Sequence, residues 1–166
     1  MILGMSTSTF TLLHVLISLV GIGSGFIVVF GMLSGKCLDG WTPIFLASTV
    51  LTSVTGFLFP IEHLLPSHKV GIISLIVLAI AIPALYVFRL AGKWRAVYVI
   101  TALMALYLNC FVAVVQSFLK IPALKAMAPT QTEPPFLVAQ TIVLTLFVAL
   151  GIFATKRFRS PAALPA

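Results

Sequence analysis

Five long stretches of this 166-residue chain are almost free of charged side chains, and they limit what the chain can fold into. They cover about residues 10–33, 42–60, 70–90, 96–119 and 136–155. Each is close to the roughly 20 apolar residues that a helix needs to cross a bilayer. Backbone groups in lipid need hydrogen-bond partners within the protein, and a helix supplies them within its own segment, so each stretch is expected to be helical. The sequence predicts an all-α integral membrane protein, a bundle of five transmembrane helices in a single membrane domain over residues 1–166.

The overall composition agrees with lipid as the solvent of this chain. Hydrophobic residues make up 61% of the sequence and charged residues 8%, whereas soluble domains carry about 25% charged residues. The net charge of +7 therefore does not indicate a nucleic-acid partner. In a membrane protein, the informative feature is the distribution of the cations along the chain. The expected partner is the lipid bilayer, with other membrane subunits or further copies of the chain as additional candidates.

The basic residues are divided unequally between the two ends of the predicted helices. Five spans place the two termini on opposite sides, and seven of the ten basic residues then share the side of the C-terminus. These seven are Lys36, Arg89, Lys93, Arg95, Lys156, Arg157 and Arg159. Since cytoplasmic connections carry the excess of Lys and Arg, the N-terminus is predicted outside and the C-terminus in the cytoplasm. In general character the chain resembles small multi-pass proteins of bacterial inner membranes, a resemblance that carries over no individual residue.

One face of the first stretch has the small residues that let membrane helices approach closely. His14, Ser18, Gly21 and Gly25 are spaced by four, three and four residues and therefore lie on one stripe of a helix. Ser18, Gly21 and Gly25 are predicted to pack against neighbouring helices. If this stripe faces inward, His14 also points into the bundle.

Strongly polar side chains concentrate in the outer half of the predicted membrane region. The predicted pocket residues are His14, Glu62, His63, His68, Asn109, Gln116 and Gln140. Because polar groups inside a membrane cost free energy, several of them at one depth suggest a pocket that opens to the outside. The alternative for Asn and Gln is hydrogen bonding between helices, and for His63 and His68 it is a position at the membrane interface.

Two functional interpretations follow. In the first, the protein is a binding or structural membrane protein, or an accessory subunit of a larger complex, and its polar groups hold helices together. In the second, it is a membrane redox protein that binds a single haem b, a transition-metal ion or a quinone through His14 with His63 or His68. Three histidines at one level allow one haem, whereas a di-haem bundle needs four on two levels. No Gly-rich phosphate loop, Ser-His-Asp set or HExxH motif is present, so no catalytic residue is assigned.

The connection over residues 120–135 is the longest one and contains four prolines. Pro122 is a suitable first residue for a short helix at the membrane interface. The alternative is an irregular Pro-rich connector that lies on the lipid headgroups.

Overall fold

The computed structural model describes residues 2, 4–59 and 66–159, and this part of the chain is helical without any strand. The helices are α1 (Thr7–Leu33), α2 (Trp41–Gly56), α3 (Pro66–Tyr86), α4 (Trp94–Lys120), α5 (Pro122–Met127) and α6 (Pro134–Arg157). The predicted all-α class is confirmed. The short helix α5 begins at Pro122, where the sequence allowed either a helix or an irregular connector.

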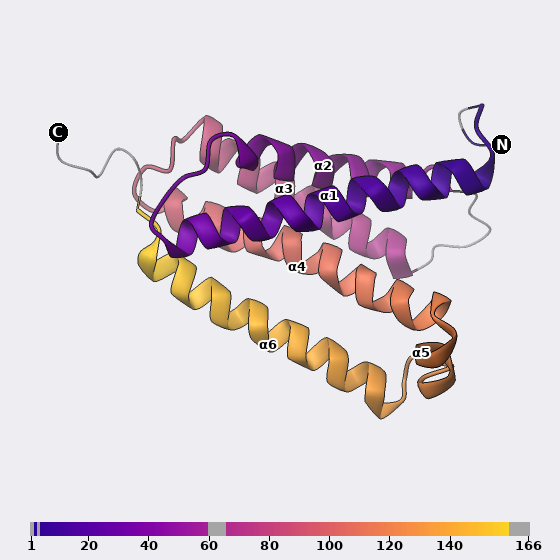
Figure 1. Cartoon of the computed structure of the whole chain (residues 1–166). Coiled ribbons are helices and arrows are strands. Elements are labelled where there is room, and N and C mark those ends of the chain that lie inside the picture. Colours follow the sequence, from indigo (N-terminus) through magenta and orange to yellow (C-terminus); the bar gives the residue numbers. More distant parts are fainter. Residues whose placement is uncertain (1, 3, 60–65, 160–166) are drawn as a thin grey trace.

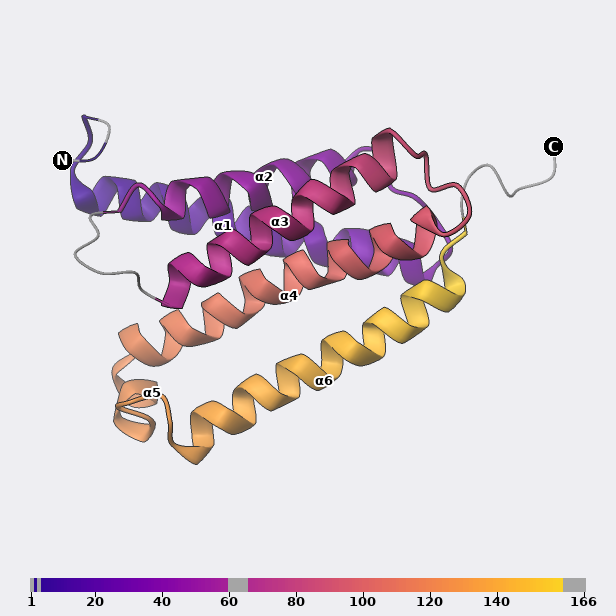
Figure 2. The ribbon, with the colours of Figure 1, turned by 180° about the vertical axis from the view of Figure 1, so that it is seen from behind.

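The five long helices run side by side with alternating direction, and α5 caps the ends of α4 and α6 (Figure 1). We call the end of the bundle where α1 begins the N-end, and the opposite end, where α6 finishes, the C-end. From behind, α3 lies between α2 and α4 (Figure 2). Helix α4 contacts every other helix and is therefore the centre of the bundle.

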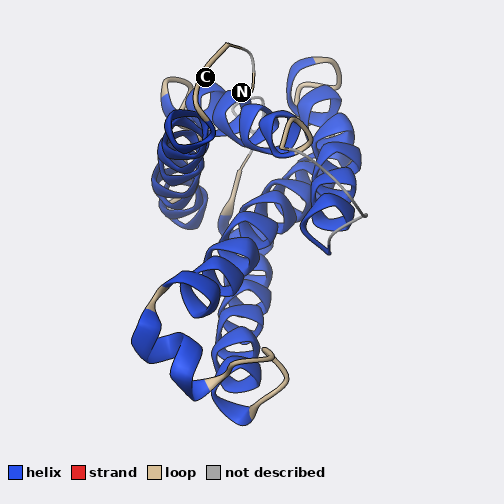
Figure 3. Ribbon diagram, turned by 90° about the vertical axis from the view of Figure 1, so that its right-hand side faces the viewer, coloured by secondary structure: helices blue, strands red, loops and turns tan. Residues whose placement is uncertain are grey.

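Helix α6 is the most peripheral long helix. It packs on α4 and α1, and Figure 3 shows the N-end portions of α4 and α6, with α5, extending away from α1 and α2. Most of its large apolar side chains are exposed, including Leu137, Ile142 and Ile152. This surface suits lipid, because lipid chains are as apolar as the side chains that meet them.

Four helical segments are long and apolar enough to cross a membrane: α1, the His68–Tyr86 part of α3, α4 and α6. Helix α2 has 16 residues, which corresponds to roughly 24 Å at about 1.5 Å per residue. It is therefore shorter than the roughly 30 Å of a typical hydrocarbon core.

Two helices finish four residues before their predicted ends. The second stretch was expected to continue to residue 60, but α2 ends at Gly56 and the amides of Phe57 and Leu58 close turns onto Val54 and Thr55. The third stretch was expected to reach residue 90, but α3 ends at Tyr86. There the amides of Val87 and Phe88 both donate to the Pro83 carbonyl. Arg89 and Leu90 follow with positive φ angles of 46° and 58°, which end the helix.

The apolar core lies between α1, α2, α3, α4 and the C-terminal half of α6, mostly toward the C-end. Its fully buried large side chains include Met32, Phe45, Leu78, Tyr98 and Leu106. A second, smaller cluster at the N-end joins α4, the α5 region and α6 through Phe118, Ala128 and Phe136. The rings of Phe118 and Phe136 meet edge to face at 5.4 Å. Leu124 of α5 packs against this cluster, so α5 is anchored on α4 and α6.

Candidate functional site

Hydroxyl side chains on α2 form the main polar element inside the bundle. They are Thr42, Ser48, Thr49, Thr52, Ser53 and Thr55. Five of the six bond a backbone carbonyl four residues earlier in the chain, for example Thr49 to Phe45 and Thr55 to Leu51. This bond uses the hydroxyl proton within the helix and leaves the oxygen lone pairs available to donors on neighbouring helices.

His14 uses one of these lone pairs. Its Nδ1 lies 2.8 Å from Thr55 Oγ1. Because the Thr55 hydroxyl already donates to the Leu51 carbonyl, we assign the proton of this contact to the histidine, which makes Nδ1 the donor and Nε2 an acceptor. The half-buried ring also meets Phe59 edge to face, with centroids 5.3 Å apart. His14 thereby joins α1 to the end of α2.

Asn109 and Gln140 bond to other helices. Asn109 Nδ2 of α4 lies 3.4 Å from Thr49 Oγ1 of α2 and donates to it. Gln140 Nε2 of α6 donates to the Phe111 carbonyl of α4 at 3.2 Å. The buried Gln140 Oε1 accepts no hydrogen bond from the described residues. Gln116 is half-buried on α4, and no hydrogen bond of its side chain is present within the described part of the chain.

His68 is buried near the beginning of α3, with 5% of its surface exposed. Its ring lies 5.7 Å from the ring of Phe57, which directly follows α2. His14 and His68 therefore pack on Phe59 and Phe57, two neighbouring aromatic residues at the same end of the bundle. Glu62 and His63 lie outside the described residues. Within the described ranges, no group of three His, Cys, Asp or Glu side chains is arranged to hold a metal ion.

The predicted pocket residues described here contact several different helix interfaces. His14 lies between α1 and α2, Asn109 between α4 and α2, and Gln140 between α6 and α4. No hydrogen bond connects these three side chains to one another within residues 2, 4–59 and 66–159. A shared outward-facing pocket stays a prediction.

The glycine stripe of α1 faces α2 and α4. A Cβ atom at Gly25 would lie 2.6 Å from Leu106 Cδ1 and 2.9 Å from Phe45 Cε2. At Gly21 it would lie 3.3–3.4 Å from Ser48, Thr49 and Asn109. Both glycines are buried. Ser18 donates to the His14 carbonyl of its own helix at 2.8 Å and makes no side-chain hydrogen bond to another helix within the described residues.

Among the polar contacts between elements that the sequence did not predict, two involve Ser53 and Gln131. Ser53 of α2 and Ser74 of α3 are both buried, with their hydroxyl oxygens 3.0 Å apart. Gln131, in the connection after α5, donates to the Val115 carbonyl at 2.8 Å. The density of hydroxyls in α2 could have indicated the first contact, because six of its 16 residues are Ser or Thr. Ser and Thr on membrane helices often bond across helix interfaces.

Comparisons with known proteins identify no relative of this chain. No protein family model matches the chain, and no curated protein or solved structure matches it.

Proposed function

We propose that the chain is a five-span protein of a bacterial inner membrane with its N-terminus outside and its C-terminus in the cytoplasm. The alternating direction of the five long helices supports this count (Figure 1). Residues 41–59 contain no charged side chain, so the turn residues after α2 extend its apolar length to about that of a span. Seven of the ten basic residues lie at the C-end, which supports a cytoplasmic C-terminus.

Within this topology, we propose a binding or structural role, as an accessory membrane subunit whose polar residues hold the helices together. The observation that carries the proposal is the set of contacts made by α2. Its hydroxyls meet His14 of α1, Ser74 of α3 and Asn109 of α4. Each such bond between membrane helices contributes on average about 0.6 kcal/mol. The exposed apolar surface of α6 suits lipid, another membrane subunit or a second copy of the chain.

A double-mutant cycle on His14 and Thr55 tests this role. Thr55→Val keeps the volume but removes the hydroxyl, and His14→Phe keeps a ring that can pack on Phe59. We expect each single variant to lower the thermal midpoint of the detergent-purified protein. The double variant should lose less than the sum, because the two groups share one hydrogen bond. Strictly additive losses would contradict the structural role of this pair.

The redox interpretation is a second candidate, supported by one observation. With Nδ1 donating to Thr55, the Nε2 atom of His14 carries a lone pair that suits a metal, a haem iron or the hydroxyl of a quinol, the reduced form of a quinone. His68 lies at the same end of the bundle, and His63 belongs to the same segment of sequence. In this function, His14 with His63 or His68 would hold the group, and the group would supply electron transfer.

An absorption spectrum of the purified protein, oxidised and dithionite-reduced, separates the two candidates when combined with elemental analysis. The structural role predicts no Soret band and no stoichiometric metal. A Soret band or bound metal that disappears in His14→Phe would instead make the redox function the leading one.

A further inference from the structure

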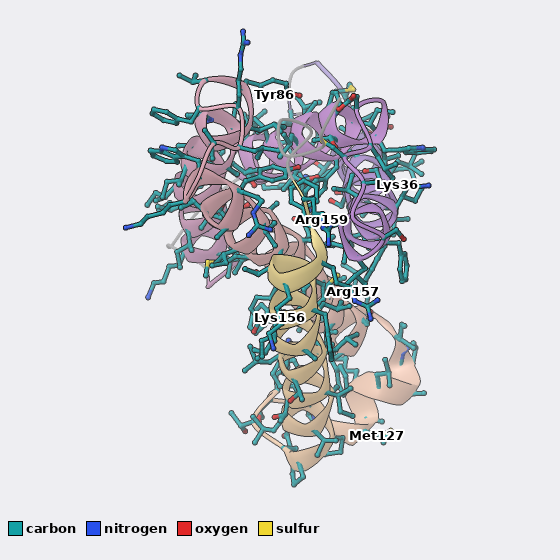
Figure 4. The ribbon with its side chains drawn as sticks, turned by 90° about the vertical axis from the view of Figure 1, so that its left-hand side faces the viewer. Lys36, Tyr86, Met127, Lys156, Arg157 and Arg159 are labelled. Atoms are coloured by element: carbon teal, nitrogen blue, oxygen red, sulfur yellow. The ribbon has the colours of Figure 1, made fainter. Side chains whose placement is uncertain are left out.

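A basic pocket lies at the C-end, between the ends of α1 and α6. None of the polar residues of the candidate site lines it. Its volume is about 430 Å³, within the roughly 300–1,000 Å³ range of ligand pockets. It is lined by Leu33, Ser34, Gly35, Lys156, Arg157 and Arg159. Figure 4 views this end and shows the three cationic residues around the end of α6, with Lys36 on the neighbouring α1–α2 connection.

Two backbone carbonyls at the end of α6 are bonded by Arg95 of α4 and not by the cations of the pocket. The last carbonyl groups of a helix carry partial negative charge and attract cations. At the end of α6 this cation is Arg95 of α4. Its Nη1 donates to the Thr155 carbonyl at 3.2 Å and also to the Phe158 carbonyl. Phe158 is 1% exposed and packs on Tyr98, so it holds the chain in place between Arg157 and Arg159.

The end of α1 is also closed by its own backbone. The amides of Gly35 and Lys36 donate to the carbonyls of Met32 and Gly31, a Schellman arrangement with Gly35 at a φ of 71°. A Cβ at Gly35 would lie 3.3 Å from the Arg157 carbonyl, so glycine lets the two helix ends approach closely. The carbonyls of Gly31 and Met32 in α1 and of Thr155 and Phe158 at the end of α6 thus have donors. No carboxylate of a described residue forms an ion pair with Lys156, Arg157 or Arg159.

We propose that this pocket binds the phosphate group of an anionic phospholipid. Guanidinium groups match phosphate oxygens with paired hydrogen bonds, and basic pockets between membrane helices bind anionic headgroups. The pocket lies where α1 and α6 leave the apolar region, which is the depth of lipid phosphates. The proposal requires α1 and α6 to cross the bilayer, but it holds for either orientation and for either proposed function.

The test compares retained lipid in the purified protein by native mass spectrometry, after exchange into phosphatidylglycerol or phosphatidylcholine at equal concentration. The wild-type chain should retain phosphatidylglycerol at least tenfold more than phosphatidylcholine. The variant Arg157→Gln/Arg159→Gln should lose most of this preference. The matched control Arg89→Gln/Lys93→Gln removes two charges from the α3–α4 turn at the same end. It should keep the preference for phosphatidylglycerol.

Three results would overturn the proposal. They are equal retention of both lipids by the wild-type chain, a loss of preference in the control as large as in the double variant, and displacement of the lipid by millimolar inorganic phosphate. The last result would make free phosphate the ligand. Arg159 lies beyond the last residue of α6 and is exposed. The single variant Arg159→Gln therefore keeps the test valid if the double variant fails to fold, and it should lower the preference severalfold.

Discussion

At position 25 of α1 the neighbouring helices leave room for little more than a hydrogen atom. The closest side chains to a Cβ there, Leu106 and Phe45, are 0% and 1% exposed. Protein interiors are close-packed, so neither side chain can move without disturbing others. The approach of α1 to α2 and α4 therefore depends on this glycine.

Gly25→Ala should destabilise the protein by about 1–3 kcal/mol, the usual cost of overpacking a core. Gly23→Ala on the same helix is the control, because a Cβ there meets nothing within 4 Å. It should leave the thermal midpoint unchanged or raise it, since alanine is the better helix former. Equal midpoints for the two variants would contradict the observed packing of α1.

The thiol of Cys37, in the connection between α1 and α2, should react slowly with alkylating reagents. Burial, the hydrogen bond to Asp39 and the charge of that residue together raise its pKa to about 11, with burial the largest cause. Since the thiolate is the reactive form, the alkylation rate in a Cys110→Ser background should still increase about tenfold per pH unit up to pH 10. A rate that levels off near pH 9 would contradict this.

Asp39→Asn tests whether Asp39 contributes to the raised pKa of Cys37. Removing the carboxylate charge should lower the Cys37 pKa, so the alkylation rate below pH 9 should increase relative to the native residue. An unchanged pH profile would show that burial alone sets the pKa.

At the scale of elements, Arg95 connects the beginning of α4 to the end of α6. Arg95→Gln should leave the carbonyls of Thr155 and Phe158 without their cationic donor and destabilise the protein by about 1–3 kcal/mol. Hydrogen exchange of the amides in residues 150–158 should increase. Lys93→Gln, at an N-cap position with no side-chain cap hydrogen bond, should change neither quantity, and equal effects in both variants would contradict the assigned role of Arg95.

The positions of the helices could be read from the sequence, but several of their ends could not. Long apolar stretches indicated where α1, α4 and α6 lie, because helices must satisfy their backbone groups in lipid. The ends of α2 at Gly56 and of α3 at Tyr86 depend on turns that apolar composition does not reveal. The sequence suggested that His14, Asn109 and Gln140 face other helices. It could not give their partners, because those depend on which helices are neighbours in the bundle.

At the scale of the whole molecule, the arrangement has a central helix, α4, and a peripheral one, α6. The C-end carries most of the cations together with the proposed lipid pocket, and the N-end carries His14, His68 and α5. Both functional proposals are made for the five-span topology. That topology requires α2 to cross the membrane. If α2 did not cross the membrane, the α3–α4 turn would lie on the same side as the beginning of α1.

Cysteine accessibility tests this directly. Ser8, at the beginning of α1, and Ala91, in the α3–α4 turn, are both exposed and can each be replaced by cysteine in a Cys37→Ser/Cys110→Ser background. On intact bacterial cells, a membrane-impermeant maleimide should label the cysteine at position 8. The one at position 91 should react only after the membrane is permeabilised. Labelling of both positions on intact cells would contradict the five-span account, and labelling of position 91 alone would contradict its orientation.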